Sequence, residues 1–227
     1  MTETVGSLTR EQWDEIEARG RASTEAEAKA MVAAENAAKA RALRETGIPA
    51  KDQERISVGT LEQTPATDAI GSGADLICLS GNPGCGKTTA AAAWLWQYLQ
   101  RADSWRPDRR MLGTPSVLPV APLPIFLKSA RLSRWERYDV KEMDRLLQSA
   151  RLVIDDLGVE FQDSKGNFMA ILDEVIDTRY DESRPTVITT NLDADAFKSR
   201  YGERIADRIR ESGKFVSLGN ASLRRRS

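Results

Sequence analysis

The sequence contains no histidine, and this absence removes several kinds of catalytic site. A chain without imidazole cannot build a Ser-His-Asp or Cys-His site, nor a zinc site with histidine ligands. Cysteine occurs only as Cys78 and Cys85, which is too few for a four-cysteine metal site. Cysteine usage this sparse is typical of a reducing compartment, so we expect a cytoplasmic protein.

Long apolar runs are also lacking. The most apolar stretch, residues 117–127, is interrupted by three prolines and is too short to span a bilayer. The first residues lack the apolar core of a signal peptide, so we expect no membrane partner. The net charge is −1, from 33 basic and 34 acidic residues. No global field therefore attracts nucleic acid, and any such site has to be a local patch.

Residues 81–89 read Gly-Asn-Pro-Gly-Cys-Gly-Lys-Thr-Thr and match the phosphate-binding P-loop pattern G-x-x-x-x-G-K-T. Its glycines permit positive φ, which lets successive N–H groups point at phosphate oxygens. Lys87 would place a cation on the β and γ phosphates, and the Thr88 hydroxyl can ligate Mg²⁺. An apolar run at residues 75–80 precedes the loop as a predicted strand, and residues 90–100 follow it as a predicted helix.

The sequence therefore predicts a site for ATP and Mg²⁺. The predicted nucleotide-binding residues in this loop are Gly81, Asn82, Pro83, Gly84, Cys85, Gly86, Lys87, Thr88 and Thr89.

Residues 151–158 contain a second motif, an apolar run that ends in Asp155 and Asp156. Carboxyl ends of parallel strands are where ligands bind in open sheets, so this has the form of a Walker B motif. Asp155 is expected to hold Mg²⁺, directly or through water. Asp156 is expected to polarise the attacking water.

Further predicted strands cover residues 124–128, 184–191 and 215–218, and predicted helices cover residues 167–180 and 201–210. Thr190 or Asn191, at the end of one strand, could bond the γ-phosphate or the lytic water, or could be a polar strand end. Arg204 and Arg208 share a face of the last helix. Arg208 could reach a neighbouring subunit's γ-phosphate, or be an ordinary surface arginine.

Residues 1–46 differ from the rest and predict a helical arm, separate from an ATPase domain at residues 47–227. Thr9 and Gln12 have the spacing of a capping box, and residues 22–43 favour helix by propensity. The arm is either a solvated, partly frayed helix or a docking element for a partner protein, with Trp13 as an anchor. Residues 50–74 look polar and irregular, and residues 102–124 look like loop.

Residues 130–150 predict one helix with a basic face. Arg131, Arg134 and Arg137 recur every third residue, and Trp135 lies near them. Cations interleaved with aromatic rings suit single-stranded nucleic acid, so these four residues are candidate DNA contacts. The alternative is a solvated basic face whose aromatic side chains belong to the core.

Taken in order, these motifs resemble the AAA+ superfamily and, within it, the DnaC/DnaI/IstB group of helicase loaders and related ATPases. The resemblance is carried by residues 47–49, 81–88, 152–158, 179–180, 184–185, 187–191 and 201–209.

This resemblance implies an α/β P-loop fold, with a five-stranded parallel sheet of order 5-1-4-3-2 flanked by helices, and a minimal lid. It implies Asn191 as the sensor 1 residue, Arg208 as a trans-acting arginine finger and Arg224 as a candidate sensor 2. The implied function is an ATPase of DNA replication that oligomerises on single-stranded DNA, with ATP at subunit interfaces. It would load or remodel a replicative helicase through the arm.

Alternatives remain. An IstB-like transposition ATPase would select duplex target DNA, and a small-molecule kinase could use the same P-loop. A nucleotide-gated scaffold with little turnover is kept open by Asp156, because many AAA+ proteins have glutamate there. The arm has no cysteine or histidine, so it cannot be the zinc-binding docking module that some loaders carry.

Overall fold

The computed structural model describes residues 10–57, 63–108, 115–134, 140–160 and 166–219. Its centre is a five-stranded sheet in which every neighbouring pair is parallel, with the order β4-β5-β6-β1-β7. The strands are β1 (Leu76–Ser80), β4 (Ile125–Lys128), β5 (Leu152–Leu157), β6 (Thr186–Thr190) and β7 (Gly213–Ser217). Counted along the chain among these five alone, the order is the predicted 5-1-4-3-2.

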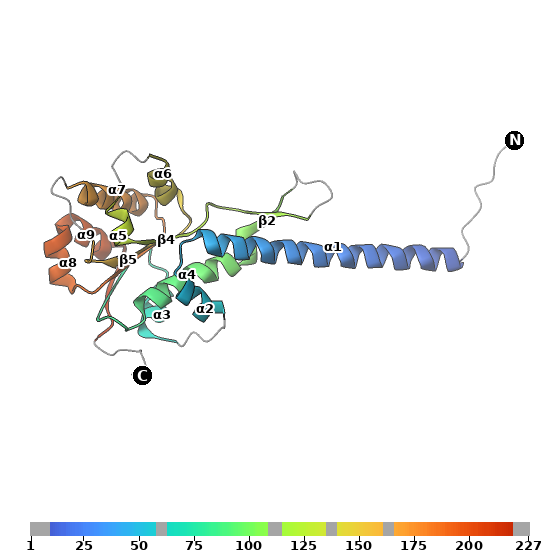
Figure 1. Ribbon diagram of the computed structural model, residues 1–227, viewed down its shortest axis with the longest axis horizontal. Helices are drawn as coiled ribbons and strands as arrows, with labels where there is room; N and C mark the ends of the chain where they lie inside the picture. The colour runs from blue at the N-terminus through green and yellow to red at the C-terminus, as the bar shows by residue number, and fades with distance from the viewer. Residues whose placement is uncertain (1–9, 58–62, 109–114, 135–139, 161–165, 220–227) are drawn as a thin grey trace.

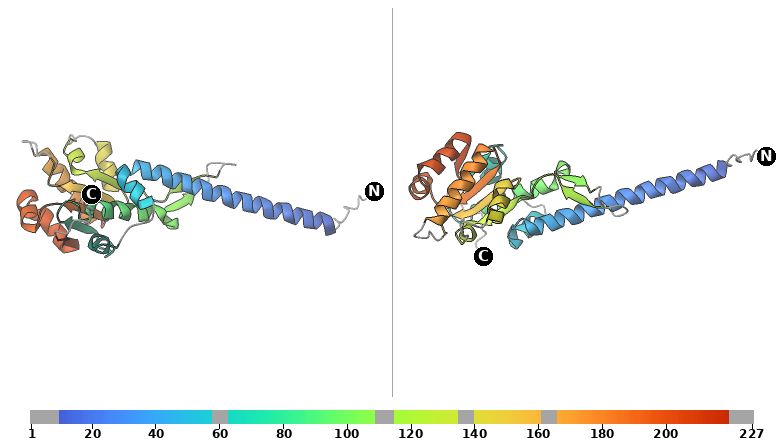
Figure 2. Two further views of the ribbon diagram at one scale, coloured as in Figure 1. Left: turned by 60° about the horizontal axis from the view of Figure 1, so that its bottom comes forward. Right: turned by 90° about the horizontal axis from the view of Figure 1, so that it is seen from above.

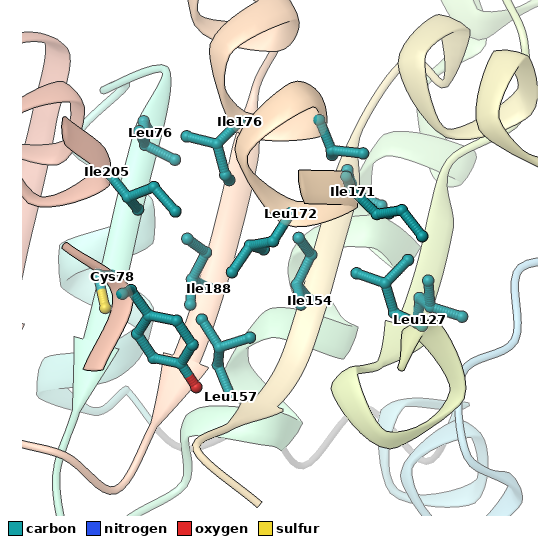
Figure 3. Close-up of a cluster of buried hydrophobic side chains, with 14 of the residues drawn as sticks. Leu76, Cys78, Leu127, Ile154, Leu157, Ile171, Leu172, Ile176, Ile188 and Ile205 are labelled. Atoms are coloured by element: carbon teal, nitrogen blue, oxygen red, sulfur yellow. The ribbon is translucent and has the colours of Figure 1, made fainter. Parts of the chain in front are cut away.

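The central strands are buried on both faces because helices cover the sheet from both sides. One core cluster joins Ile154 and Ile188 to Leu172 of α7 (Asn167–Asp181) and Ile205 of α9 (Glu203–Ser212), as Figure 3 shows. The alternate residues Val153 and Val187 pack on the other face, against α4 (Lys87–Gln100). This period of two is the pattern of a parallel sheet between two helical layers. The helix before α9, α8 (Ala194–Tyr201), buries Phe197 in the first cluster.

Residues 102–124, expected to be loop, instead contain a short hairpin. After a 3-10 turn at Ala102–Ser104, β2 (Trp105–Pro107) pairs antiparallel with β3 (Val117–Pro119). The Trp105 indole donates a 2.8 Å hydrogen bond to the Leu99 carbonyl, and the Ser104 hydroxyl donates to the Tyr98 carbonyl. These hydrogen bonds hold the hairpin against the last turn of α4, and the proline-rich composition of the segment does not predict them.

Residues 50–74, expected to be irregular, carry α2 (Ala50–Ser57) and α3 (Pro65–Ile70). Pro65 is at the start of α3, where proline is tolerated. Thr64 caps that helix in a reciprocal pair with Thr67. Ile56 and Ile70 are buried against α4, so tertiary packing stabilises two helices that are too short to form alone.

The single helix predicted at residues 130–150 is wrong. The structure has α5 (Ser129–Leu132), with Ser133 as its C-cap, and α6 (Val140–Gln148). The Ser133 hydroxyl bonds the Ala130 carbonyl and its N–H bonds the Ser129 carbonyl, which closes the short helix. Leu132 and Leu146 then enter the same core cluster from two separate helices.

Helix α1 (Arg10–Glu45) projects away from the domain as a long rod (Figures 1 and 2). From residue 30 onward one side of it is partly buried, next to α4 and β3. Between residues 14 and 29 every side chain described is exposed, and ion pairs four residues apart, such as Glu15–Arg19 and Glu25–Lys29, line the helix. Thr9 lies outside the described residues, as does the side chain of Trp13. The arm as a separate docking domain stays a prediction.

Across the segments that the structure describes, no helix combines the length and apolarity that a membrane span requires.

Arg179 of α7 is the largest fully buried side chain described, with 1% of it exposed. Its guanidinium donates to the carbonyls of Leu146, Ser149 and Pro185 and to the Thr186 hydroxyl. Burial lowers the pKa of Arg179 to about 10, and the charge of Arg184 adds to the effect. A buried cation solvated by carbonyl groups joins the end of α6 to the start of β6.

We predict that Arg179→Leu lowers the free energy of unfolding by about 3 kcal/mol or more, because several buried carbonyls lose their donor. Urea unfolding followed by circular dichroism measures this. Arg184→Ala is the matched control: Arg184 bonds Gln148 from a more exposed position, and its loss should cost less than about 1 kcal/mol. Equal unfolding midpoints for Arg179→Leu and the unchanged protein would contradict the assignment.

Candidate nucleotide-binding site

The P-loop connects β1 to α4 at the carboxyl edge of the sheet. Gly81, Gly84 and Gly86 have φ of 154°, 94° and 91°, so all three adopt the positive φ that the motif predicts. Helix α4 begins at Lys87, directly after the loop. The first N–H groups of a helix lack partners within it and carry the positive end of its dipole, so they can bind an anion.

Lys87 is nearly buried, and its ammonium group lies across the loop. It donates to the carbonyls of Gly81 and Asn82, at 2.6 and 3.1 Å, and to Oδ1 of Asn191, at 3.1 Å. Asn191 directly follows β6, the strand next to β1. The fold thus brings together a cation and an amide that lie 104 positions apart in the chain. Thr190, the other residue considered at this strand end, donates its hydroxyl to the Leu157 carbonyl instead.

Asp155 lies in β5 and is fully buried. Its Oδ1 accepts hydrogen bonds from the hydroxyls of Thr88, at 2.9 Å, and Thr189, at 2.7 Å. Desolvation is the largest cause of a raised pKa for this carboxyl, and the charge of Asp156 adds to it. The bonds from Thr189 and Thr88 and the charge of Lys128 lower the pKa, but less.

The second oxygen of Asp155, Oδ2, is buried without a hydrogen-bond partner in the described part of the chain. A buried carboxylate oxygen of this kind, beside the Thr88 hydroxyl, fits Mg²⁺. No group of three or more His, Cys, Asp or Glu side chains suited to a metal occurs among the described residues. That is consistent with Mg²⁺, which often takes one or two protein ligands and completes its shell with phosphates and water. Bound there, Mg²⁺ would neutralise charge on the phosphates.

Asp156 has a strained backbone, with φ of 58°, where β5 bulges between Ile154 and Leu157. Its N–H donates to the Thr189 hydroxyl at 2.9 Å, and its half-exposed carboxylate pairs with Lys128 at 3.5 Å. Activation of water by Asp156 stays a prediction. Sequence reasoning missed Thr189, which bonds both aspartates. The only signal was its place in a strand that ends in three polar residues.

Arg208 of α9 is held against α7 of its own subunit. Its guanidinium donates two hydrogen bonds to Oδ1 of Asp177, at 2.9 and 3.1 Å, and lies 4.4 Å from the centre of the Tyr180 ring. Arg204 bonds the other Asp177 oxygen. Burial raises the pKa of Asp177, but the bonds from Arg208 and Arg204 outweigh it, so the pKa lies below its ordinary value. The finger role of Arg208 stays a prediction.

The remaining predicted residues are separated or undescribed. Arg131 lies in α5 and Arg134 follows it, both exposed, so they do not share a long helical face as expected. Trp135, Arg137 and Arg224 lie outside the described residues. Cys85 is buried, with its sulfur 3.6 Å from the Lys87 ammonium.

Comparison with known proteins supports the motif-based interpretation. No family model matches the chain. It is 29% identical over 131 residues to the replicative helicase loader DnaC of Escherichia coli (strain K12), covering 58% of this chain and 48% of DnaC. The chain resembles the DnaC-like group of AAA+ helicase loaders. It spans about half the length of the curated relatives it matches.

Two further likenesses complete the comparison of this DnaC-like chain. It is 27% identical over 163 residues to the protein YdaV of the same strain, covering 69% of this chain and 58% of YdaV. The crystal structure of the DnaC helicase loader aligns with a TM-score of 0.47 at 21% identity, covering 78% of this chain and 95% of that one.

We predict that Asp155→Asn raises the melting temperature of the ligand-free protein at pH 7 by a few degrees. Since folding raises the pKa of Asp155, its ionised form destabilises the native state. That cost is absent below the unfolded pKa of about 3.9 and grows as pH rises through the folded pKa. The same variant should lose the extra stabilisation by Mg²⁺-ATP. Differential scanning calorimetry with and without Mg²⁺-ATP measures both.

The control for this prediction is Asp156→Asn, whose carboxylate is partly exposed and paired with Lys128. Its melting temperature without ligand should stay close to that of the unchanged protein. A lower melting temperature for Asp155→Asn would show that the threonine hydrogen bonds outweigh desolvation, which is the opposite of the expected direction.

Proposed function

We propose that this chain is an ATP-dependent DNA replication protein that works as a helicase loader. It would hydrolyse ATP, oligomerise on single-stranded DNA and deliver or remodel a replicative helicase. The observation that carries the proposal is the sequence identity with the helicase loader DnaC, joined to a P-loop whose lysine and threonine contact Asn191 and Asp155.

The geometry supports a nucleotide triphosphate as ligand. Lys87 and Asn191 meet at one side of the loop, and Thr88 meets Asp155 at the next residue of α4. A γ-phosphate near Lys87 would therefore be close to the Asn191 amide. Thr88 and Asp155 would hold Mg²⁺, which would supply positive charge to neutralise the phosphates. These roles rest on the site's internal contacts.

The contacts of Arg208 support a site shared between subunits. Helix α9 presents Arg208 from a surface on which Asp177 and Tyr180 fix its direction. In the proposed oligomer this oriented arginine faces the γ-phosphate bound by the adjacent subunit, where a guanidinium stabilises the charge of the transition state.

We predict that Arg208→Ala lowers DNA-stimulated ATP hydrolysis on the order of 10³-fold or more, while nucleotide affinity changes little. Arg204→Ala is the matched control, because Arg204 lies one turn away and also pairs with Asp177 but is more exposed. It should retain hydrolysis within a few fold. Steady-state phosphate release, measured with single-stranded DNA present, separates the two variants. Wild-type turnover by Arg208→Ala would exclude the finger role.

The exposed half of α1 supports a docking role for the arm, because residues 14–29 offer their described side chains to solvent while residues 30–45 pack near the domain. We predict that a chain without residues 1–29 still binds ATP but no longer captures a purified hexameric replicative helicase. Affinity capture with the full chain as reference measures this. Capture that is undiminished would place the helicase contact elsewhere, and capture of a transposase in place of helicase would favour target-DNA selection.

A scaffold with little turnover is the second candidate. It is favoured by the ion pair between Asp156 and Lys128, because a carboxylate held by a lysine is less available to polarise an attacking water. The same hydrolysis assay decides it. Appreciable turnover with DNA and helicase present removes the scaffold, whereas nucleotide-dependent assembly without turnover supports it.

A further inference from the structure

Asp52 is a buried carboxylate that neither the motifs nor the proposed catalytic site uses. It lies in α2, whose first residue, Ala50, follows the end of α1 at Glu45 after the short turn 46–49. Only 1% of Asp52 is exposed. A charged side chain this deeply buried normally has its polar atoms satisfied.

The contacts of Asp52 reach the nucleotide site. Its Oδ1 accepts a 2.9 Å hydrogen bond from the hydroxyl of Thr89, which directly follows the P-loop pattern at residues 81–88. Its Oδ2 is enclosed and has no partner in the portion of the chain described. Helix α2 is otherwise held to α4 by packing, with Ile56 in the same core cluster as Ala90 and Ala93.

Thr89 lies in the first turn of α4, where unpaired N–H groups are available to phosphates. A threonine hydroxyl has a single hydrogen. While that hydrogen is donated to Asp52, the hydroxyl cannot donate to a phosphate oxygen. The carboxylate also adds negative charge beside a site that we propose binds a polyanion. A phosphate oxygen that reached the Thr89 hydroxyl would therefore compete with Asp52 for its hydrogen.

We propose that Asp52 is a positioning residue that couples the nucleotide site to the root of the arm through Thr89. In the free protein the Asp52–Thr89 bond holds α2 against the P-loop helix. Phosphate takes over the Thr89 hydroxyl and releases Asp52. Because Asp52 then has neither of its oxygens bonded, α2 shifts, and the short turn 46–49 passes that shift to the last turns of α1. This inference rests on the proposed nucleotide function.

The change in nucleotide affinity on removal of Asp52 distinguishes a carboxylate that only supports the fold from one that competes with phosphate. If Asp52 only supported the fold, its removal would weaken nucleotide binding. If it competes with phosphate, Asp52→Ala should bind a fluorescent ATP analogue about threefold to tenfold more tightly, the effect of one hydrogen bond. Asp52→Asn should also bind more tightly, but by less, because its amide oxygen still accepts from Thr89 while the charge is gone.

The test uses the full chain and two measurements, titration with the fluorescent ATP analogue and amide hydrogen exchange of residues 42–57 with and without it. In the unchanged protein we expect the nucleotide to speed exchange in this segment. In Asp52→Ala exchange should already be fast and should not respond, whereas in Asp52→Asn, which keeps an acceptor for Thr89, the response should be smaller than in the unchanged protein. Glu54→Ala is the matched control, since Glu54 is exposed on the same helix. It should keep the affinity and the response.

Each outcome decides the proposal. Weaker binding by both variants, or an unaltered exchange response, overturns the coupling but leaves ATP binding in place. The coupling is also overturned if the unchanged protein binds the analogue but the hydrogen exchange of residues 42–57 does not change. Failure of the unchanged protein to bind the analogue overturns the proposed function and this inference together. If Asp52→Ala does not fold, Asp52→Asn, which keeps the side-chain volume, carries both measurements.

Discussion

The site depends on one buried charge. Asp155 lies fully enclosed at the centre of the sheet, and its Oδ1 accepts hydrogen bonds from both Thr88 and Thr189. These bonds join three elements that are distant in sequence: the P-loop helix, β5 and β6. Desolvation makes the carboxylate costly, as its raised pKa records, and its second oxygen is left unbonded within the described chain. The fold tolerates this cost at the place where a cation would relieve it.

Much of the sheet could be predicted from the sequence because its strands are short apolar runs that end in polar residues. The P-loop glycines, Asp155 and Asn191 follow from the same patterns, and the structure brings Lys87 and Asn191 into contact. Local sequence patterns did not predict the elements whose secondary structure depends on tertiary contacts. The hairpin at β2 and β3 depends on bonds from Ser104 and Trp105 to the end of α4, and α2 and α3 depend on packing.

The contacts missed from sequence share one physical cause. Thr189, Asp52 and Arg179 are polar residues whose partners come from other elements. Periodicity reports which face of a helix or strand is buried, but it does not report which donor meets which acceptor. A buried polar residue is visible only as a break in an apolar pattern, so its partner has to come from the three-dimensional arrangement. Ser129 at the start of α5 belongs to the same class, since its hydroxyl donates to the Asp156 carbonyl of β5.

Helix α1 is supported by the domain at one end only. Its 36 residues correspond to a length of about 54 Å, and only the second half rests near the domain. The unsupported part, residues 10–29, is about 30 Å long, so a tilt of about 5° where the support ends would move its far end by roughly 3 Å. Gly20 lies within the unsupported half, and a Cβ added to it would meet no atom within 4 Å. Glycine weakens a helix interior, so the helix backbone is least stabilised at that point of the unsupported half.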